Sequence, residues 1–351
     1  MCRVKAMVYR RTGGPEVIQA EELDIPEPGP GELLVRVAVS GVNPTDWKSR
    51  TGDGSGAPPA PAGWQVPNQD GAGIVVAVGN GVDPVLLHER VWLGESAYRR
   101  PWGTAAEYTV VPARKTVLLG TAPYDIGAAL GVPFVTAHRC LTVGEYLPDR
   151  VDAGSLSGRT VLVQGGAGAV GNAAIQLARW ADATVIATVS SPEKAQLAAA
   201  AGASHVVNYR QQDVAAEVRK IVPDGVDVVV EVDPAANAAT DAAVLGPNGS
   251  VAMYAATADQ TVTVPIRPMM VANARWQFVL LYTMPEHAKV AAAEDVSAAV
   301  VDGAVGIGRE SGLPIHRFPL SDTAGAHAAV EAGAVGKVLV TVDEDPPARV
   351  G

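Results

Sequence analysis

Residues 160–171 read TVLVQGGAGAVG and decide the fold of this chain. Four strand-like apolar residues lead into a glycine-rich turn, and apolar residues at 170, 174, 177 and 178 then recur at helical spacing. The glycines match the G-x-G-x-x-G pattern of dinucleotide-binding turns, because glycine permits a tight turn, a close approach of the backbone to a pyrophosphate, and close packing of helix on strand. The free N–H groups at the start of the helix then hold the anion. The predicted cofactor-binding residues of this turn are Gly166, Ala167, Gly168, Ala169, Val170 and Gly171.

The end of the next predicted strand, residues 184–189, indicates which dinucleotide is bound. A turn that binds NAD carries an acidic residue about 20 positions after the glycines, which holds the ribose 2′-hydroxyl. This chain has Ser190 and Ser191 there, followed by Lys194, and the set suits a 2′-phosphate because hydroxyls donate hydrogen bonds and lysine adds a positive charge. We therefore expect NADPH rather than NADH. Ser191 also suits the N-cap of a helix with Pro192 in its first turn, and the two roles are compatible.

Length, charge and cysteine content narrow the class of protein. With 351 residues, of which 48% are hydrophobic, two domains with full cores are expected. A net charge of −10 disfavours nucleic acid or an anionic membrane as the main partner, and no apolar run approaches the roughly 18 residues of a membrane span. The first residues read as a strand rather than a signal peptide, and Cys2 and Cys140 give no disulfide framework. We expect a cytoplasmic protein.

The N-terminal part of the chain is rich in predicted strands and in glycine and proline. Strands are expected at residues 32–39, 74–78 and 105–111, and a long proline-containing loop is expected over 52–67. A helix is predicted over residues 125–145. This pattern indicates a β-rich domain.

From Gly158 onward strands and helices alternate, which predicts a doubly wound parallel sheet and an α/β fold. Ser321 and Asp322 are expected to cap a late helix. The last predicted strand, residues 337–341, could belong to either domain. If it completes the N-terminal domain, the chain crosses the boundary between the two domains twice. The expected later strands are residues 205–207, 226–230, 250–254, 276–281 and 337–341.

Four further segments are informative together with the glycine turn: GVNPTD at 41–46, DGAG at 70–73, GTAAEY at 103–108 and VPFVTA at 132–137. With these segments the chain resembles, over nearly its whole length, the medium-chain dehydrogenase/reductase superfamily. Within that superfamily it is similar to the zinc-independent quinone oxidoreductase or zeta-crystallin-like branch.

The resemblance implies a domain organisation, a cofactor and an oligomeric state. A GroES-like β-rich domain over residues 1–130 would be completed by about 310–351, and a Rossmann domain with a doubly wound parallel sheet would cover 131–309. NADPH would bind in the cleft between the two domains. The family is usually homodimeric.

The positions that hold zinc in other members of the superfamily have changed. Zinc alcohol dehydrogenases carry a cysteine where this chain has Asn43, and a Gly-His-Glu where it has Asn68, Gln69 and Asp70. Catalytic zinc needs about three ligands from Cys, His, Asp or Glu. The six histidines are scattered, and the family's four-cysteine lobe is absent. We expect no bound metal.

The resemblance also implies catalytic residues. Asn43 and Asp46 would lie near the nicotinamide ribose, and Thr136 and His138 would start the helix beneath the nicotinamide ring. Relatives often have a tyrosine at the position of His138. Histidine there could bind the ribose or donate a proton near neutral pH, and the alternative is that it only packs.

The substrate loop departs from the family. Two tyrosines that some relatives carry near the quinone correspond to Lys48 and Gly54, and no tyrosine stands between Asn43 and Pro67. This difference makes an enoyl-thioester reductase a less favoured interpretation of the sequence. It also means that the tyrosines that contact the quinone in some relatives have no counterpart here. Trp47 and Lys48 are the predicted substrate residues, although Trp47 and Trp64 suit packing as well as stacking on a flat acceptor.

The remaining cofactor contacts rest on the resemblance alone. Tyr209 would border the adenosine, and Lys337 would replace a C-terminal basic residue of relatives. The residues that follow the strands passing the nicotinamide would be Tyr254, Ala255, Phe278, Val279 and Leu280.

The sequence thus predicts an NADPH-dependent oxidoreductase that reduces quinones or related electron-poor carbonyl compounds without a metal. Hydride transfer would then depend on placing the nicotinamide against an electron-poor carbon. Two alternatives stay open: an enoyl or alkenal double-bond reductase, and an NADPH-binding structural or regulatory protein without turnover. A short-chain dehydrogenase is disfavoured because no Tyr-x-x-x-Lys is present, and a P-loop enzyme because Gly-Lys-Ser/Thr is missing.

Overall fold

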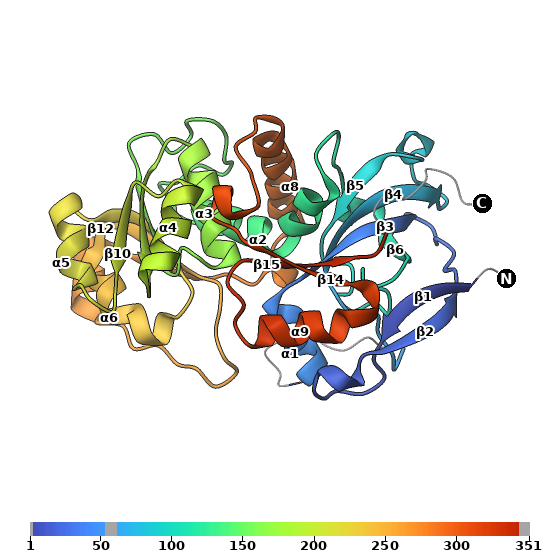
Figure 1. The fold of residues 1–351 in the computed structure, drawn as a ribbon. Helices are drawn as coiled ribbons and strands as arrows, with labels where there is room; N and C mark the ends of the chain where they lie inside the picture. The colour runs from blue at the N-terminus through green and yellow to red at the C-terminus, as the bar shows by residue number, and fades with distance from the viewer. Residues whose placement is uncertain (1–2, 53–61, 344–351) are drawn as a thin grey trace. The chain divides into compact units, whose positions relative to one another are not determined.

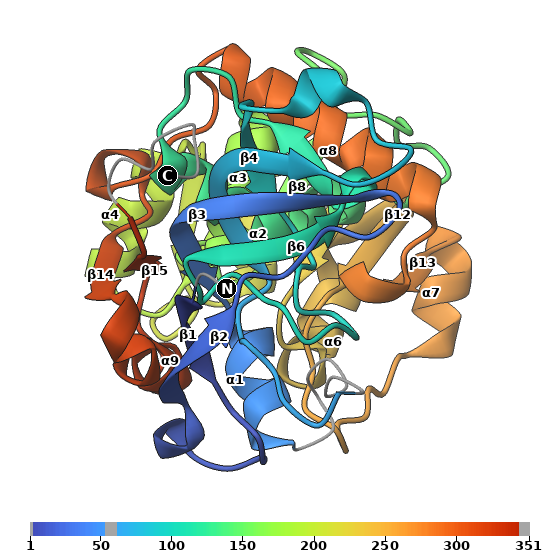
Figure 2. The same cartoon turned by 90° about the vertical axis from the view of Figure 1, so that its right-hand side faces the viewer.

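The computed structural model describes residues 3–52 and 62–343, and the chain divides into two compact units (Figures 1 and 2). The first unit comprises residues 1–132 and 315–351, and the second comprises 133–314. The N-terminal unit is therefore completed by the C-terminal part of the chain. Residues 53–61 of the predicted 52–67 loop, including Gly54, lie outside the described residues.

The N-terminal unit is built on a seven-stranded mixed sheet and a two-stranded hairpin. Figure 2 shows β4, β3 and β6 side by side, and β3 pairs antiparallel with both neighbours. The order along the sheet is β14-β15-β3-β4-β5-β7, with β6 on β3. The hairpin strands are β1 (Arg3–Val8) and β2 (Gln19–Asp24). The sheet strands are β3 (Glu32–Val42), β4 (Asp70–Val78), β5 (Arg90–Leu93), β6 (Tyr108–Pro112), β7 (Thr116–Leu118), β14 (Ile315–Pro319) and β15 (Lys337–Thr341).

Two short helices lie side by side in this unit. Helix α1 (Pro44–Thr51) follows β3 directly and contacts α9 (Thr323–Glu331), which also packs on β15 (Figure 1). Asp322 caps α9 as predicted, since its Oδ1 accepts a hydrogen bond from Gly325 N–H at 3.1 Å. Helix α1 was not expected from the sequence, and it gives the predicted substrate residues a rigid helical support instead of a loop.

The second unit is a six-stranded parallel sheet in the order β10-β9-β8-β11-β12-β13. This is the 3-2-1-4-5-6 order of dinucleotide-binding folds, so the predicted doubly wound sheet is confirmed. The sixth strand ends at residue 278, three residues before the predicted end. The strands are β8 (Thr160–Val163), β9 (Thr184–Val189), β10 (His205–Asn208), β11 (Val226–Glu231), β12 (Leu245–Met253) and β13 (Arg275–Phe278).

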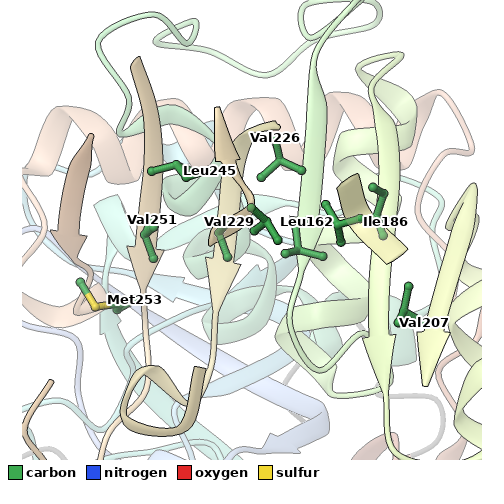
Figure 3. Close-up of a cluster of buried hydrophobic side chains, with 10 residues drawn as sticks. Leu162, Ile186, Val207, Val226, Val229, Leu245, Val251 and Met253 are labelled. Atoms are coloured by element: carbon green, nitrogen blue, oxygen red, sulfur yellow. The ribbon is translucent and has the colours of Figure 1, made fainter. Parts of the chain in front are cut away.

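Helices cover this sheet in two groups. Helix α3 packs against α4 and α8, and α5 packs against α6. Valine-rich strands buried on both faces meet α5 and α6 in one core, which includes Leu162, Val229 and Val251 (Figure 3). The helices are α3 (Ala169–Trp180), α4 (Pro192–Ala201), α5 (Val214–Ile221), α6 (Pro234–Val244), α7 (Ile266–Ala272) and α8 (Glu286–Val301).

Helix α2 (Tyr124–Thr142) spans the boundary between the two units in sequence. It corresponds to the helix predicted over 125–145, but begins one residue earlier and ends three residues earlier. Among the residues that the structure describes, no helix combines the length and the apolar content that a membrane span requires.

Candidate functional site

The glycine turn joins β8 to α3, and the fold requires three of its glycines for two different reasons. Gly165 has a φ of +73°, which favours glycine. A Cβ on Gly166 would lie 2.8 Å from the Ala187 Cβ, and a Cβ on Gly171 would collide with the Gly165 carbonyl oxygen. These positions need glycine because strand, turn and helix pack closely there.

Gly168 differs, because the protein itself leaves room for a side chain there. It is exposed, and an added Cβ would meet only the Gly165 carbonyl oxygen, at 3.5 Å. It is the N-cap residue of α3, and no side chain among the described residues caps that helix end. The first N–H groups of α3, from Ala169 and Val170, are therefore available to an anion. This arrangement fits a dinucleotide pyrophosphate.

The predicted 2′-phosphate residues lie together where β9 ends. Ser191 is the N-cap of α4, and its Oγ accepts a hydrogen bond from Lys194 N–H at 3.3 Å. Ser190 and Lys194 are half-buried beside it. Tyr209 is half-exposed and is fixed to the same strand end, since its N–H donates to the Val189 carbonyl at 3.1 Å. The capping role of Ser191 is thus observed, and its predicted cofactor role stays open.

The sequence analysis missed one cation near this strand end. Arg309, in a short 3-10 helix (Arg309–Ser311) that packs on α4, has its guanidinium 3.9 Å from the Glu193 carboxylate. Hydrogen bonds hold the preceding and following residues on α3: the Asn172 amide donates to the Ser311 carbonyl at 2.8 Å, and Gly306 N–H donates to Gln176 Oε1 at 2.7 Å. No short motif marks Arg309, because it is brought here from over 100 positions away in the chain.

The predicted nicotinamide-side residues follow two other strands. Tyr254 and Ala255 come directly after β12, and the Tyr254 N–H donates to the Glu231 carbonyl at 3.1 Å. Val279 is buried and donates its N–H to the Met253 carbonyl at 2.7 Å, whereas its neighbours are exposed. Phe278 and Leu280 have relative exposures of 72% and 55%.

His138 is bound within the second unit. It is 1% exposed on α2, and its Nε2 lies 2.7 Å from Asp295 Oδ2 on α8. Arg150 and the Val151 N–H also donate to Asp295. Burial raises the pKa of Asp295, but these hydrogen bonds outweigh burial and lower the pKa to about 2. The geometry favours the structural alternative for His138, since a side-chain partner already occupies Nε2. Thr136, two residues earlier on α2, is also buried.

In the N-terminal unit, a buried polar cluster forms where β3, β4 and β15 meet the start of α1. The Asp46 carboxylate accepts hydrogen bonds from the N–H groups of Asn43 (2.7 Å) and Gln69 (3.1 Å). The Asn43 side chain lies between two charged groups: its Nδ2 donates to Asp70 Oδ2 and its Oδ1 accepts from Lys337 Nζ, both at 2.7 Å. Lys337 Nζ is also 3.5 Å from Asp70 Oδ2.

Burial governs the charges of this cluster. It raises the pKa of Asp46 to about 8, with a further contribution from the charge of Asp70. It also raises the pKa of Asp70 and lowers that of Lys337, although their mutual attraction opposes both shifts. Lys337 was predicted to contact cofactor, and the structure places its ammonium in this cluster, 1% exposed.

These residues do not fit a zinc ion. The amide of Asn43 and the carboxylate of Asp70 are already bound to one another and to a fixed ammonium, and the Gln69 side chain supplies neither thiolate nor imidazole. Within residues 3–52 and 62–343, no group of three or more His, Cys, Asp or Glu side chains could hold a metal.

The predicted substrate residues lie on α1. Lys48 Nζ is 5.9 Å from the centre of the Trp47 ring, and both side chains are half-buried. Trp64 instead packs edge-on against Trp102, with ring centres 5.5 Å apart, next to a core cluster. Packing therefore accounts for Trp64.

Comparisons with known proteins agree with this architecture. The family model of the alcohol dehydrogenase GroES-like domain matches residues 29–121, and that of the zinc-binding dehydrogenase matches residues 169–297. A quinone oxidoreductase of Lama guanicoe is 30% identical over 345 residues, which cover 96% of this chain and 97% of that protein. A solved mycobacterial structure, described as complexed with NADPH, is 27% identical, has a TM-score of 0.79 and covers 96% of this chain and all of that one.

A second relative differs in length. The mouse synaptic vesicle membrane protein VAT-1 homolog is 33% identical over 253 residues, which are 72% of this chain and 58% of that protein. This chain thus spans less than two thirds of that relative.

A GroES-like unit joined to a doubly wound dinucleotide-binding unit defines the class of the medium-chain dehydrogenases and reductases. The chain belongs to the quinone oxidoreductase-like family of that superfamily, as predicted.

Proposed function

We propose that this protein is an NADPH-dependent oxidoreductase that reduces small quinones or related electron-poor carbonyl compounds without a metal. The observation that carries the proposal is the uncapped N-terminus of α3 at the exposed Gly168, followed at the next strand end by Ser190, Ser191 and Lys194. The relatives named quinone oxidoreductase support the substrate class, and the NADPH-bound neighbour supports the cofactor.

The residues of this chain would hold and orient the cofactor. The N–H groups at the start of α3 would bind the pyrophosphate, and Ser190 and Lys194 would bind the 2′-phosphate. NADPH, when bound, supplies a hydride to the acceptor. The catalytic roles of Asn43, Asp46 and Thr136, and the substrate roles of Trp47 and Lys48, are part of the proposal and rest on the family resemblance.

Metal independence is proposed on the chemistry of the Asn43 cluster. Since a lysine ammonium already binds the carboxylate and the amide there, the charge that zinc would neutralise is compensated. Orientation and exclusion of water would then account for the rate.

We also propose a cytoplasmic homodimer. The β13 edge of the parallel sheet and the adjoining α7 expose large apolar side chains, which a second copy would cover. These side chains are Ile266, Met270, Val271, Phe278 and Leu280. Light scattering should give twice the chain mass, and Phe278→Asp should shift it toward the monomer. A monomeric wild type would refute the dimer.

The function is tested by NADPH consumption with a panel of quinones, enones and aldehydes. Gly168→Asp is the matched inactive variant: the Cβ has room, the side chain can cap α3, and the carboxylate repels the pyrophosphate. Thr184→Asp adds the same charge at the other end of β9 and should leave NADPH binding intact. NADPH binding without turnover on any acceptor would favour the non-catalytic alternative. Turnover on enones alone would favour the double-bond reductase.

A further inference from the structure

Two buried carboxyl groups interact with one another, and one of them is hydrogen-bonded to Gln164, the residue before the glycine turn. The site described above does not use them. Glu231 is the last residue of β11 and Asp241 lies on α6, and both are 0% exposed. Glu231 Oε1 accepts hydrogen bonds from the Asn237 amide at 3.0 Å and from the Asp233 N–H. Asp241 Oδ1 accepts from the Gln164 amide at 2.9 Å.

The second oxygen of each carboxyl group has no N–H or O–H donor. Glu231 Oε2 and Asp241 Oδ2 are buried and have no hydrogen-bond partner among the described residues, and the two carboxyl groups are close enough to share a side-chain hydrogen bond when one of them is protonated. Two adjacent carboxylates that are both ionised repel one another strongly in a dry interior, so one of them must carry a proton that it donates to the other.

A directional chain of hydrogen bonds connects this pair to the glycine turn. Because Asp241 accepts from Gln164 Nε2, the Gln164 Oε1 faces Thr188 and accepts its hydroxyl proton at 2.6 Å. The Thr188 Oγ1 then accepts the Gly165 N–H at 3.2 Å, and the Thr188 carbonyl accepts the Gly166 N–H at 3.0 Å. Each step fixes the direction of the next one.

We propose that Glu231 and Asp241 share one proton, and that this pair acts as a positioning unit which, through Gln164 and Thr188, holds the glycine turn in its dinucleotide-binding conformation. The link to the dinucleotide rests on the proposed function; the shared proton does not. Loss of the proton would place a second charge on the pair, separate Asp241 from Glu231 and remove the acceptor that orients Gln164.

The charges around the pair agree with this proposal. Burial, the charge of Glu231 and their hydrogen bond together raise the pKa of Asp241 to about 9, and burial also raises that of Glu231. The Asp233 carboxylate adds to the rise at Glu231. The Tyr254 hydroxyl, directly after β12, interacts electrostatically with Glu231 and with the Cys140 thiol of α2. Burial raises the pKa of both Tyr254 and Cys140, so both groups stay neutral at physiological pH.

The shared proton is tested by unfolding the full chain in urea between pH 5 and 8. The folded pair keeps a proton that the unfolded chain has released, so rising pH must favour unfolding. The ratio of the wild-type unfolding constant to that of Asp241→Asn should therefore rise about tenfold per pH unit. In the variant, the asparagine oxygen still accepts from Gln164 and its NH₂ group donates to Glu231, so no shared proton is needed. Glu231→Gln should behave in the same way, whereas Asp227→Asn, at the other end of β11, should keep the wild-type slope.

The link to the glycine turn is tested by NADPH affinity between pH 7 and 10. The dissociation constant of the wild type should rise about tenfold or more above pH 9, and that of Asp241→Asn should stay within about twofold. If the unfolding constants of the wild type and of Asp241→Asn changed equally with pH, the shared proton would be overturned. The same alkaline loss of NADPH binding in both proteins would overturn the link to the turn. Absence of NADPH binding at any pH would refute the proposed function and the role of the turn, while the unfolding data would still decide the shared proton.

Discussion

Replacing Lys337 by methionine should strongly destabilise the N-terminal unit. Methionine keeps most of the side-chain volume, so the change mainly removes the ammonium from contact with Asn43 Oδ1 (2.7 Å) and Asp70 Oδ2 (3.5 Å). An acceptor left without its donor costs about 1–3 kcal/mol, and breaking a buried ion pair from one side costs about 3–5 kcal/mol. Since both losses describe the same event, we expect about 3–5 kcal/mol in the free energy of unfolding.

The pH dependence gives the sign of this effect. Without the ammonium, the pKa of the Asp70 carboxyl rises further above its unfolded value. A carboxyl with a raised pKa contributes stability that is lost as the pH rises through its folded pKa. Urea unfolding at pH 5 and pH 8 should therefore show a larger loss for Lys337→Met at pH 8.

Two further variants make the test specific. Lys220 forms an exposed ion pair with Glu217 on α5, so Lys220→Met should cost about 0.5 kcal/mol or less. Adding Asp70→Asn to Lys337→Met removes the uncompensated charge and should restore part of the stability. A loss below about 1 kcal/mol for Lys337→Met, with no difference between pH 5 and 8, would refute the reasoning.

Three other outcomes follow from the site. NADPH should bind at least about tenfold tighter than NADH in calorimetric titration, and Lys194→Ala should remove most of that preference with little change for NADH; equal affinities in the wild type would contradict the 2′-phosphate assignment. His138→Phe should lower the free energy of unfolding by about 1–3 kcal/mol, because Asp295 loses a buried hydrogen-bond partner. The kcat of this variant should be nearly unchanged. A kcat loss of about 10²-fold in a stable variant would instead support proton donation by His138. Elemental analysis should find well under one zinc per chain, and stoichiometric zinc would overturn metal independence.

The sequence predicted the features that depend on neighbouring residues. The strand, glycine turn and helix at 160–180 could be predicted because the glycine spacing and the apolar period lie within one short segment. The same holds for the N-caps Ser191 and Asp322, which begin α4 and α9. Helix α1 was missed because its few residues show no apolar period, although Asn43-Pro44 is a recognisable start.

The polar clusters could not be predicted, because their members are far apart in the chain. Lys337 joins Asn43 across 294 positions, and Gln164 joins Asp241 across 77. Composition gives no sign of which aspartates are buried. The predicted roles of the site residues thus stay predictions, whereas the family and the fold class are confirmed by the comparisons and the sheet order.

The two units bury acidic side chains by different means. In the N-terminal unit the ammonium of Lys337 compensates Asp70, and Asp46 has its pKa raised to about 8 by burial. In the second unit a proton takes the place of the ammonium between Glu231 and Asp241. Loss of the Lys337 proton would remove a positive charge beside Asp70, whereas loss of the shared proton would add a second negative charge to the Glu231–Asp241 pair. The formal charge counted from the sequence therefore overstates the negative charge of the folded protein. Through Gln164 and Thr188, the proposed shared proton would make the hydrogen bonds of the glycine turn depend on pH.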